Sequence, residues 1–310
     1  MNRGILFAGI VLLAATSIVS AQQVPDLEYQ PPLPRPAYES GNGPRVAIDE
    51  AHHNFHTADG RYQPFAELLR RDGYRVDGLG KPLSSDSLNG VDVLVIANAL
   101  NERNVKDWSL PTPSAFTTDE IAAVRAWVEK GGSLFLIVDH MPFPGAAGDL
   151  AKAFGVEFSN GFAASKPTER PATFTFRQGT GLEESAVTQG RGDQERVTEV
   201  ATFVGSAFKP PQDATPVLVF SANFVSLKPN KAWQFTAATP KEPLEGWCQG
   251  AVMKVGNGRV AVFGEAAMFS AQRAGPRQHP MGMNAPEAKQ NHQLLLNVMH
   301  WLTRAKGMPD

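Results

Sequence analysis

The chain has 310 residues, and its 29 lysines and arginines nearly balance its 31 aspartates and glutamates, which gives a formal net charge of −2 at pH 7. A chain this close to neutral, without basic or acidic runs, is not expected to take nucleic acid or an anionic membrane surface as its main partner. Its single cysteine, Cys248, excludes an internal disulfide and suits a bacterial periplasm better than a disulfide-stapled extracellular module.

Residues 1–21 have the pattern of a secretory signal peptide. Arg3 supplies the positive charge, residues 5–19 form an apolar region, and a Val-Ser-Ala sequence ends it with the small residues of a cleavage site. The apolar region is too short for a comfortable membrane span, and no other stretch approaches its length. We therefore expect a mature chain that begins near Gln22, has no membrane span after signal cleavage, and is periplasmic or secreted.

The next segment, residues 22–44, is rich in proline and is predicted to be a leader that is either extended over the surface or disordered. After it, apolar strand patterns alternate with helical ones. The predicted elements are a strand at 45–49, a helix within 62–73, strands at 74–77 and 91–99, a helix after Thr117, and a strand in 133–140. This alternation predicts a parallel, doubly wound sheet.

The clearest of these helices begins at a capping box. Thr117 stands at the cap position, and Glu120 is placed to reach back to it. Ile121, Val124 and Val128 form an apolar stripe on this helix, and Gly131 with the glycine after it is expected to end it.

From about residue 167 to 245 the pattern changes to short β-like pieces separated by proline and glycine, which predicts a β-rich insertion. A hairpin with its turn at 256–258 and a final helix through Leu302 close the chain. The predicted fold is therefore one α/β domain over residues 45–305, with a doubly wound, mostly parallel sheet and the insertion at about 167–245.

Polar side chains capable of chemistry follow three of the predicted strands. They are Asp49 with His52, His53 and His56 after the first strand, Asp139 and His140 after the strand in 133–140, and Glu265 after the last strand. Because ligands of open parallel sheets bind beyond the carboxyl ends of the strands, we expect these groups to share one edge.

Three interpretations of this set remain open. Carboxylates and imidazoles suit a divalent metal such as zinc, with one position left for water. The candidate metal ligands are Asp49, His52 and His56. The same groups suit catalysis without metal, in which a carboxylate orients a histidine that acts as general base. The candidate catalytic residues are Asp139, His140, His53 and Glu265. In the third interpretation the aspartates cap turns and the histidines hydrogen-bond within a polar loop.

Among weaker candidates, Trp233 and Trp247 are able to stack on a sugar ring, although core packing is the commoner fate of tryptophan. Cys248 is interpreted as a packed small hydrophobe rather than a nucleophile.

Two parts of the sequence resemble a known superfamily. The stretch "FTTDEIAAVRAWVEKGGSLFLIVDH" resembles the helix–Gly-Gly–strand segment of the class I glutamine-amidotransferase-like superfamily, and "GRVAVFGEAAMF" with "NHQLLLNVMHWL" looks like its closing strand and helix. The resemblance is to non-amidotransferase branches, namely ThuA-like proteins and a bacterial domain of unknown function related to the GIFT domain of gliding and intraflagellar-transport proteins. It covers residues 45–158 and 250–302.

This resemblance implies a flavodoxin-like, amidotransferase-like sheet. Where true amidotransferases carry the nucleophilic cysteine, this chain has Asp139 and His140, so the resemblance does not extend to cysteine-dependent glutamine hydrolysis. ThuA-like relatives often keep a histidine there and are linked to carbohydrate metabolism. The resulting expectation is a hydrolase-type site, with or without a metal, for a small polar or carbohydrate-like substrate. The alternative is a non-catalytic module that binds a sugar or a protein.

Overall fold

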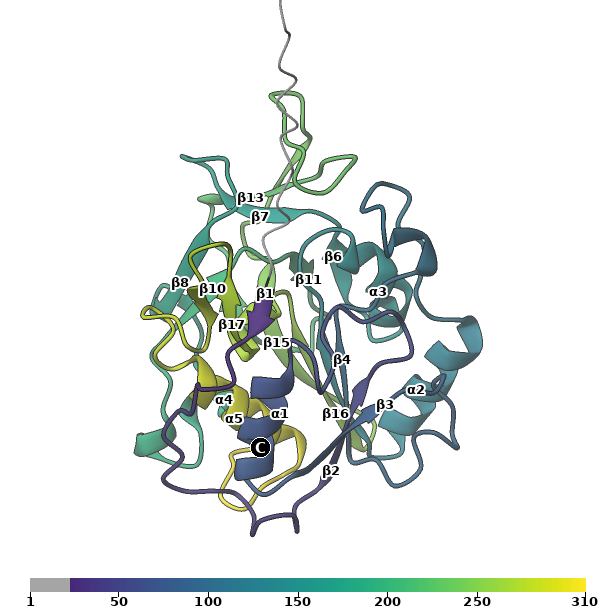
Figure 1. The fold of residues 1–310 in the computed structure, drawn as a ribbon, viewed down its shortest axis with the longest axis vertical. Coiled ribbons are helices and arrows are strands. Elements are labelled where there is room, and N and C mark those ends of the chain that lie inside the picture. Colours follow the sequence, from purple (N-terminus) through teal and green to yellow (C-terminus); the bar gives the residue numbers. More distant parts are fainter. Residues whose placement is uncertain (1–22) are drawn as a thin grey trace, which may run out of the picture.

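The computed structural model describes residues 23–310, so the predicted signal peptide at 1–21 lies outside the described residues (Figure 1). The helices are α1 (Gln63–Arg71), α2 (Thr118–Glu129), α3 (Phe143–Lys152), α4 (Ala186–Gln189) and α5 (Asn291–Leu302). Short 3-10 helices occur at Glu102–Asn104, Asp193–Glu195 and Ala267–Phe269. No helix within residues 23–310 combines the length and hydropathy needed to cross a membrane.

The centre of the molecule is a twelve-stranded mixed sheet. Five strands that run parallel to one another form one half of it. In spatial order they are β3 (Arg75–Leu79), β2 (Arg45–Asp49), β4 (Val93–Ala97), β5 (Ser133–Ile137) and β16 (Gly258–Phe263). This half contains every strand predicted between residues 45 and 140.

The other half of the sheet continues from β16 and is largely antiparallel. Its strands, in spatial order from β16, are β15 (Cys248–Val255), β12 (Thr215–Val219), β9 (Gly181–Leu182), β8 (Thr173–Gln178) and β10 (Glu199–Phe203). Off this path, β11 (Ala207–Lys209) pairs with β15, and β6 (Glu157–Ser159) pairs with β11. Strands of the predicted β-rich region therefore extend the main sheet through β15. The sheet as a whole is mixed, and its parallel strands are confined to one half apart from β8 and β9.

Two small sheets complete the fold. One contains β1 (Gln23–Pro25), β17 (Ala271–Ala274) and β18 (His279–Gly282), and the other contains β14 (Lys241–Pro243), β13 (Phe224–Leu227) and β7 (Phe162–Ser165). β1 belongs to the proline-rich leader, so of the two predicted alternatives the leader lies extended on the body of the protein. It is also fixed further along, where Ala37 N donates to Asp72 Oδ1 at 2.6 Å.

Alternate residues of the parallel strands face two separate cores. In β4, Val93, Val95 and Ala97 pack in the core that includes α1 and α5, whereas Leu94 and Ile96 pack in the core that includes α2 and α3. All five residues of β4 are buried, which explains the continuous apolar run in its sequence. Helices therefore cover both faces of the parallel strands, and the predicted α/β class is confirmed.

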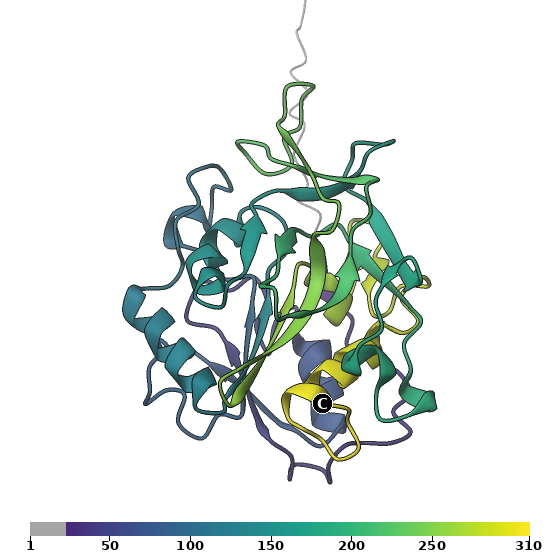
Figure 2. The ribbon, with the colours of Figure 1, turned by 180° about the vertical axis from the view of Figure 1, so that it is seen from behind.

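The predicted hairpin is confirmed as β15 and β16, which pair antiparallel from Gly250↔Phe263 to Val255↔Gly258 and run across the view in Figure 2. Gly256 in its turn has φ +57°, and a Cβ atom added there would lie 2.8 Å from the carbonyl oxygen of Glu129. Both the backbone conformation and the close approach of α2 thus require glycine at this position.

Candidate functional site

Four adjacent parallel strands end in polar residues at the same edge of the sheet. Asp49 ends β2, Asn98 follows β4, Asp139 and His140 follow β5, and Glu265 follows β16. Asn98 was not among the predicted site residues, although it directly follows the apolar run of β4. Applying the carboxyl-edge rule to that strand as well would have identified it.

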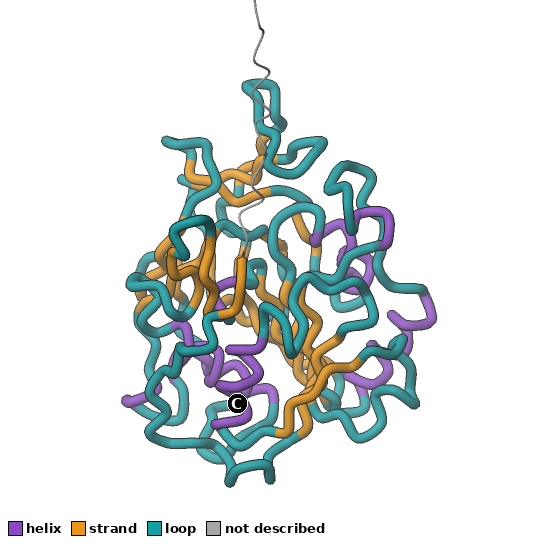
Figure 3. Tube along the Cα trace, viewed as in Figure 1, coloured by secondary structure: helices purple, strands orange, loops and turns teal. Residues whose placement is uncertain are grey.

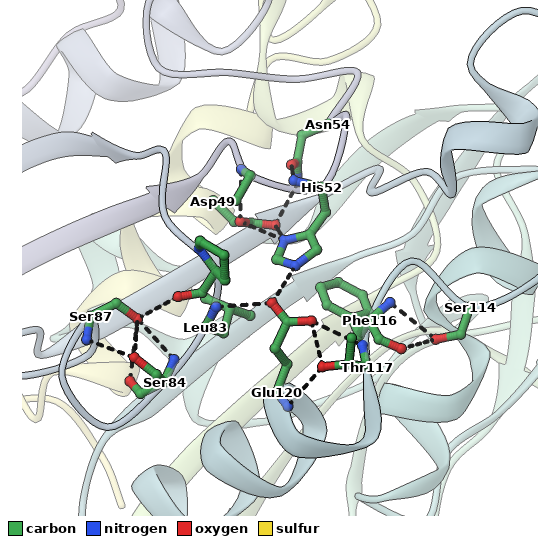
Figure 4. Close-up of polar contacts among 12 residues, drawn as sticks. Asp49, His52, Asn54, Leu83, Ser84, Ser87, Ser114, Phe116, Thr117 and Glu120 are labelled. Carbon is green, nitrogen blue, oxygen red and sulfur yellow. Dashed lines mark hydrogen bonds and ion pairs between the residues drawn. The ribbon is translucent and has the colours of Figure 1, made fainter.

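His52 lies between two carboxylates, as Figure 4 shows. Its Nδ1 is 2.9 Å from both carboxylate oxygens of Asp49, and its Nε2 is 3.0 Å from Glu120 Oε1. Asn54 Nδ2 also donates to Asp49 Oδ2 at 2.9 Å. These contacts fasten the loop after β2 to the first turn of α2.

Glu120 joins this cluster while also capping its own helix. Its Oε2 accepts from Thr117 N at 2.9 Å and Thr117 Oγ1 at 2.8 Å, and its N donates to Thr117 Oγ1, which confirms the predicted capping box. Leu83 N donates to Oε1 at 3.1 Å. Burial alone would favour the neutral acid, but these hydrogen bonds and the one from His52 outweigh it and lower the pKa of Glu120 to about 2.

The same cluster favours a charged imidazole. Burial by itself lowers the pKa of His52, but the hydrogen bonds and negative charges of Asp49 and Glu120 outweigh burial, so the pKa lies above its usual value. The side chains of Asp49 and His52 are almost completely buried. The arrangement is therefore a buried carboxylate–imidazolium–carboxylate contact, which we call the His52 cluster.

The three candidate metal ligands, Asp49, His52 and His56, are not brought to one point. Both ring nitrogens of His52 face carboxylates, and Nδ1 of the buried His56 lies 3.2 Å from the side-chain nitrogen of Asn98. Within residues 23–310, no group of three or more His, Cys, Asp or Glu side chains is placed to hold a metal ion. The placement of Asp49, His52 and His56 therefore does not fit the predicted metal site. His53 is exposed, with φ +48°.

Asp139 and His140 form a second group, held by hydrogen bonds to the backbone. Asp139 N donates to Asn98 Oδ1 at 2.8 Å, and His140 N donates to Asp139 Oδ1 at 2.7 Å. His140 Nδ1 is 2.8 Å from the carbonyl oxygen of Met141. Because a carbonyl oxygen only accepts, Nδ1 carries the proton, and the neutral ring has its lone pair on Nε2, 4.0 Å from Asp139 Oδ1.

Glu265 completes this second group from β16. It is fully buried, and its carboxylate accepts from Ala267 N at 2.8 Å and Met268 N at 2.7 Å. Burial and the charge of Asp139 raise its pKa to about 8, and burial also raises the pKa of Asp139. Two carboxyl groups so placed cannot both ionise easily, so the pair holds a proton near neutral pH.

Aromatic rings surround His140. Its ring stacks on Phe162 with a centroid distance of 4.4 Å and an angle of 14°, and Trp233 meets it edge-on at 4.7 Å. Trp233 is 51% exposed. Trp247, the other tryptophan considered for sugar stacking, is buried beneath Lys209, whose Nζ lies 4.6 Å from the ring centroid, and so serves in packing.

Asn98 links the two groups. Its carbonyl oxygen accepts from Phe55 N at 2.9 Å, its side-chain oxygen accepts from Asp139 N, and its side-chain nitrogen lies beside His56. The histidine loop and the Asp139-His140 turn therefore meet at one edge of the sheet, as the carboxyl-edge rule predicts. A cavity of about 350 Å³ lies elsewhere, at the amino ends of β4 and β5, lined in part by Asp92 and Ser133.

Cys248 is expected to be unreactive in the folded protein. Its side chain is 1% exposed, and burial raises its pKa to about 12, so little thiolate forms at pH 8. We expect Ellman's reagent to label the native protein negligibly over an hour at pH 8 and to label one thiol completely in 6 M guanidinium chloride, where the labelling rate rises by about two orders of magnitude or more. Rapid labelling of the native protein would contradict this placement.

Stability is expected to be greatest between about pH 5 and pH 6.5. His56 is buried, and burial lowers the pKa of its ring to about 3, so this group adds stability as the pH rises from 3 to its unfolded value of 6.5. Glu120, with its lowered pKa, stabilises the fold above its unfolded pKa of 4.5 and loses that contribution as the pH falls towards 2. Glu265 keeps its proton in the folded state, so its contribution falls as the pH rises from 4.5 to about 8, offsetting the gain from His56 up to pH 6.5 and lowering stability above it. His52, with its raised pKa, adds a loss above pH 6.5. Each proton contributes a slope of about 1.4 kcal/mol per pH unit.

Urea unfolding between pH 3 and pH 9 measures this profile. Glu265→Gln, which keeps a neutral side chain, should make the alkaline limb shallower and leave the fall in stability below pH 4.5 unchanged, while the loss from His52 remains. A profile that still rises from pH 5 to pH 8 would contradict these assignments.

Comparison with protein-family models finds no match for this chain, and comparison with curated proteins finds none either. Among solved structures, the "mmIFT52 N-terminal domain" is similar at 15% identity and a TM-score of 0.58, covering 84% of this chain and 98% of that chain. A ThuA-like protein from Bacteroides uniformis has 14% identity and a TM-score of 0.47, covering 86% of this chain and 94% of that one. At these identities the likeness to the IFT52 domain shows a shared fold alone, and the lower TM-score of the second adds no argument.

Proposed function

We propose that the protein is an exported hydrolase-type enzyme whose site at the carboxyl edge acts on a small polar or carbohydrate-like molecule. The observation that carries this proposal is the state of His140. Its Nδ1 proton is held by a carbonyl oxygen, its Nε2 lone pair is free to accept a proton, and the carboxylate of Asp139 lies beside it. An imidazole oriented in this way next to a carboxylate is suited to act as a general base.

The proposed chemistry assigns a role to each group. His140 Nε2 accepts a proton from a water molecule as that water attacks the substrate, and Asp139 stabilises the imidazolium that forms. Glu265 is assigned the role of keeping its own proton, since burial and the charge of Asp139 raise its pKa to about 8, so that the negative charge of the two groups stays on Asp139. His53, exposed on the neighbouring loop, is proposed to contact substrate at the rim of the site. No step passes through a metal.

The strand order supports a flavodoxin-like arrangement. When the five parallel strands are numbered 1 to 5 along the chain, their order across the sheet is 2-1-3-4-5. This is the flavodoxin-like order of doubly wound folds. Together with the "GGSLFLIVDH" segment and the fold shared with the IFT52 domain, this supports our proposal that the chain is a non-amidotransferase member of the amidotransferase-like superfamily, related to ThuA-like and GIFT-type proteins.

Export is proposed from the pattern of residues 1–21. Its test is mass spectrometry of protein from the periplasmic or secreted fraction, where the N-terminus should lie at or near Gln22. Recovery of intact protein that still begins with Met1 would overturn it.

A hydrolysis screen tests the activity. The full mature protein is incubated with a panel of 4-nitrophenyl glycosides and with 4-nitrophenyl acetate, and release of 4-nitrophenolate is measured. We expect the wild type to hydrolyse at least one glycoside, and we expect the double variant Asp139→Asn/His140→Gln to have lost this activity. His279→Gln, a change at an exposed histidine on β18, is the matched control and should keep full activity.

The screen also addresses the second candidate function, a non-catalytic sugar-binding module. The observation that favours it is the half-exposed indole of Trp233 beside His140. Sugar binding without turnover would replace the hydrolase proposal with this one. Turnover that persists in the double variant would place the activity elsewhere.

A further inference from the structure

Trp233 differs from the other tryptophans of the chain in its exposure. Its side chain is 51% exposed, whereas Trp247 and Trp301 are buried and Trp108 and Trp127 are partly buried. A large aromatic side chain left in water gives up the free energy that burial would supply. Packing of the core therefore does not account for a tryptophan at this position.

The backbone at Trp233 is also unusual. Its φ is +66°, in the left-handed region that bulky side chains rarely adopt. Such a conformation costs free energy and persists only where surrounding contacts hold it, which is common at ligand-binding sites. The structure thus maintains a strained backbone in order to present an indole to solvent.

The contacts that hold this conformation come from a separate loop. Trp233 lies in the segment between β13 and β14, which is a loop in Figure 3 and projects beyond β13 and β7 in Figure 1. Ala232 N donates to Trp108 O at 2.9 Å, and Lys231 pairs with Ser109 in an isolated β-bridge. Lys231 Nζ also lies 3.2 Å from Asp107 Oδ1. The two loops form one support for the indole.

This support places the indole against the proposed proton-transfer group. The rings of Trp233 and His140 are 4.7 Å apart at 77°, and Phe162 packs against both, 4.8 Å from Trp233 and 4.4 Å from His140. A molecule resting on the free part of the indole would therefore have His140 beside it, with Asp139 Oδ1 4.0 Å from His140 Nε2. A flat apolar surface next to groups that exchange hydrogen bonds and protons matches a sugar ring, which has apolar C–H faces and hydroxyl edges.

We propose that Trp233 is a binding and specificity-determining residue, on which a pyranose ring of the substrate stacks so that its hydroxyls face His140 and Asp139. This inference rests on the proposed function, because it names the substrate class of the same site. It also assigns the loop between β13 and β14 the role of holding the indole over the site.

Binding of disaccharides to the mature protein tests the proposal. The probes are maltose, cellobiose, xylobiose and diacetylchitobiose, with affinity measured by saturation-transfer NMR and calorimetry. We expect at least one to bind, and Trp233→Ala to weaken it about tenfold or more, as loss of aromatic stacking would. Leu27→Ala, at an apolar residue of the leader that is 57% exposed, is the matched control and should leave affinity unchanged.

A second variant separates binding from folding. Asparagine tolerates the left-handed conformation, so Trp233→Asn should keep the melting temperature within about 3 °C of wild type while losing the sugar. Unchanged affinity in both variants, or no binding of any disaccharide by the wild type, would overturn the proposal. Self-association of the wild type that Trp233→Ala abolishes would overturn it too, since the indole would then dock against protein.

The results also distinguish this inference from the proposed function. Binding that depends on Trp233 without hydrolysis of any sugar would sustain the stacking site and end the hydrolase proposal. Hydrolysis by Trp233→Ala with an unchanged KM would sustain the hydrolase proposal and end the stacking site.

Discussion

Replacing His140 by glutamine is expected to lower kcat/KM for the glycoside identified in the screen by about two to four orders of magnitude. Glutamine preserves size and polarity but cannot accept the proton of the attacking water. Asp139→Asn should also lower kcat/KM, because a neutral amide does not stabilise the imidazolium as a carboxylate does. The measurement is steady-state hydrolysis, with far-ultraviolet circular dichroism to show that each variant is folded.

The two single variants and their double variant form a cycle. In the proposed mechanism His140 and Asp139 act as one unit, so the double variant should be little worse than His140→Gln alone. Additive losses would show that the two residues act independently. A folded His140→Gln variant that keeps a third or more of wild-type activity would remove His140 from the reaction.

Replacing His52 by alanine is expected to lower the free energy of unfolding by about 3–5 kcal/mol, because it leaves two buried carboxylates without their shared positive partner. Asp49 is completely buried and Glu120 is 8% exposed, so water cannot replace the imidazolium readily. Such a loss is a large part of the stability of an ordinary domain. Urea unfolding at pH 6 measures it.

The neighbouring histidine supplies the control. His53 is exposed, and His53→Ala should change the free energy of unfolding by about 0.5 kcal/mol or less. If His52→Ala costs less than about 1 kcal/mol at pH 6, the His52 cluster does not hold the charged ring that its geometry indicates.

Features that depend on nearby residues were predictable from the sequence. Three features are each set by residues that are close together in the sequence. They are the buried run of β4, the capping box at Thr117 and Glu120, and the glycine turn between β15 and β16. Because these patterns are local, the α/β class and the shared edge of the site followed from them.

Features that depend on distant partners were not predictable. Glu120 was assigned to its own helix cap, yet it also pairs with His52, 68 positions away. In the same way, the strands between residues 167 and 245 join the main sheet because β12 pairs with β15. The sequence of β15 does not indicate which strand it pairs with.

The metal prediction illustrates a further limit. Close spacing in a loop brings residues near one another but does not fix the direction of each side chain. His53 adopts a left-handed backbone, and the histidines on either side of it contact different partners, His52 the carboxylates and His56 the amide of Asn98. Residue types and spacing therefore suggested a set of metal ligands whose side chains, in the fold, point to different partners.

The position of β16 has a consequence for how the protein unfolds. This strand, buried along its whole length, is bonded to the parallel half through β5 and to the antiparallel half through β15. If one half unfolded while the other stayed folded, an apolar strand would be exposed with unpaired backbone hydrogen-bonding groups. The two halves are therefore expected to unfold as one cooperative unit. A fragment that ends before residue 166 would leave β5 as a bare apolar edge, which is a template for aggregation rather than a folded domain.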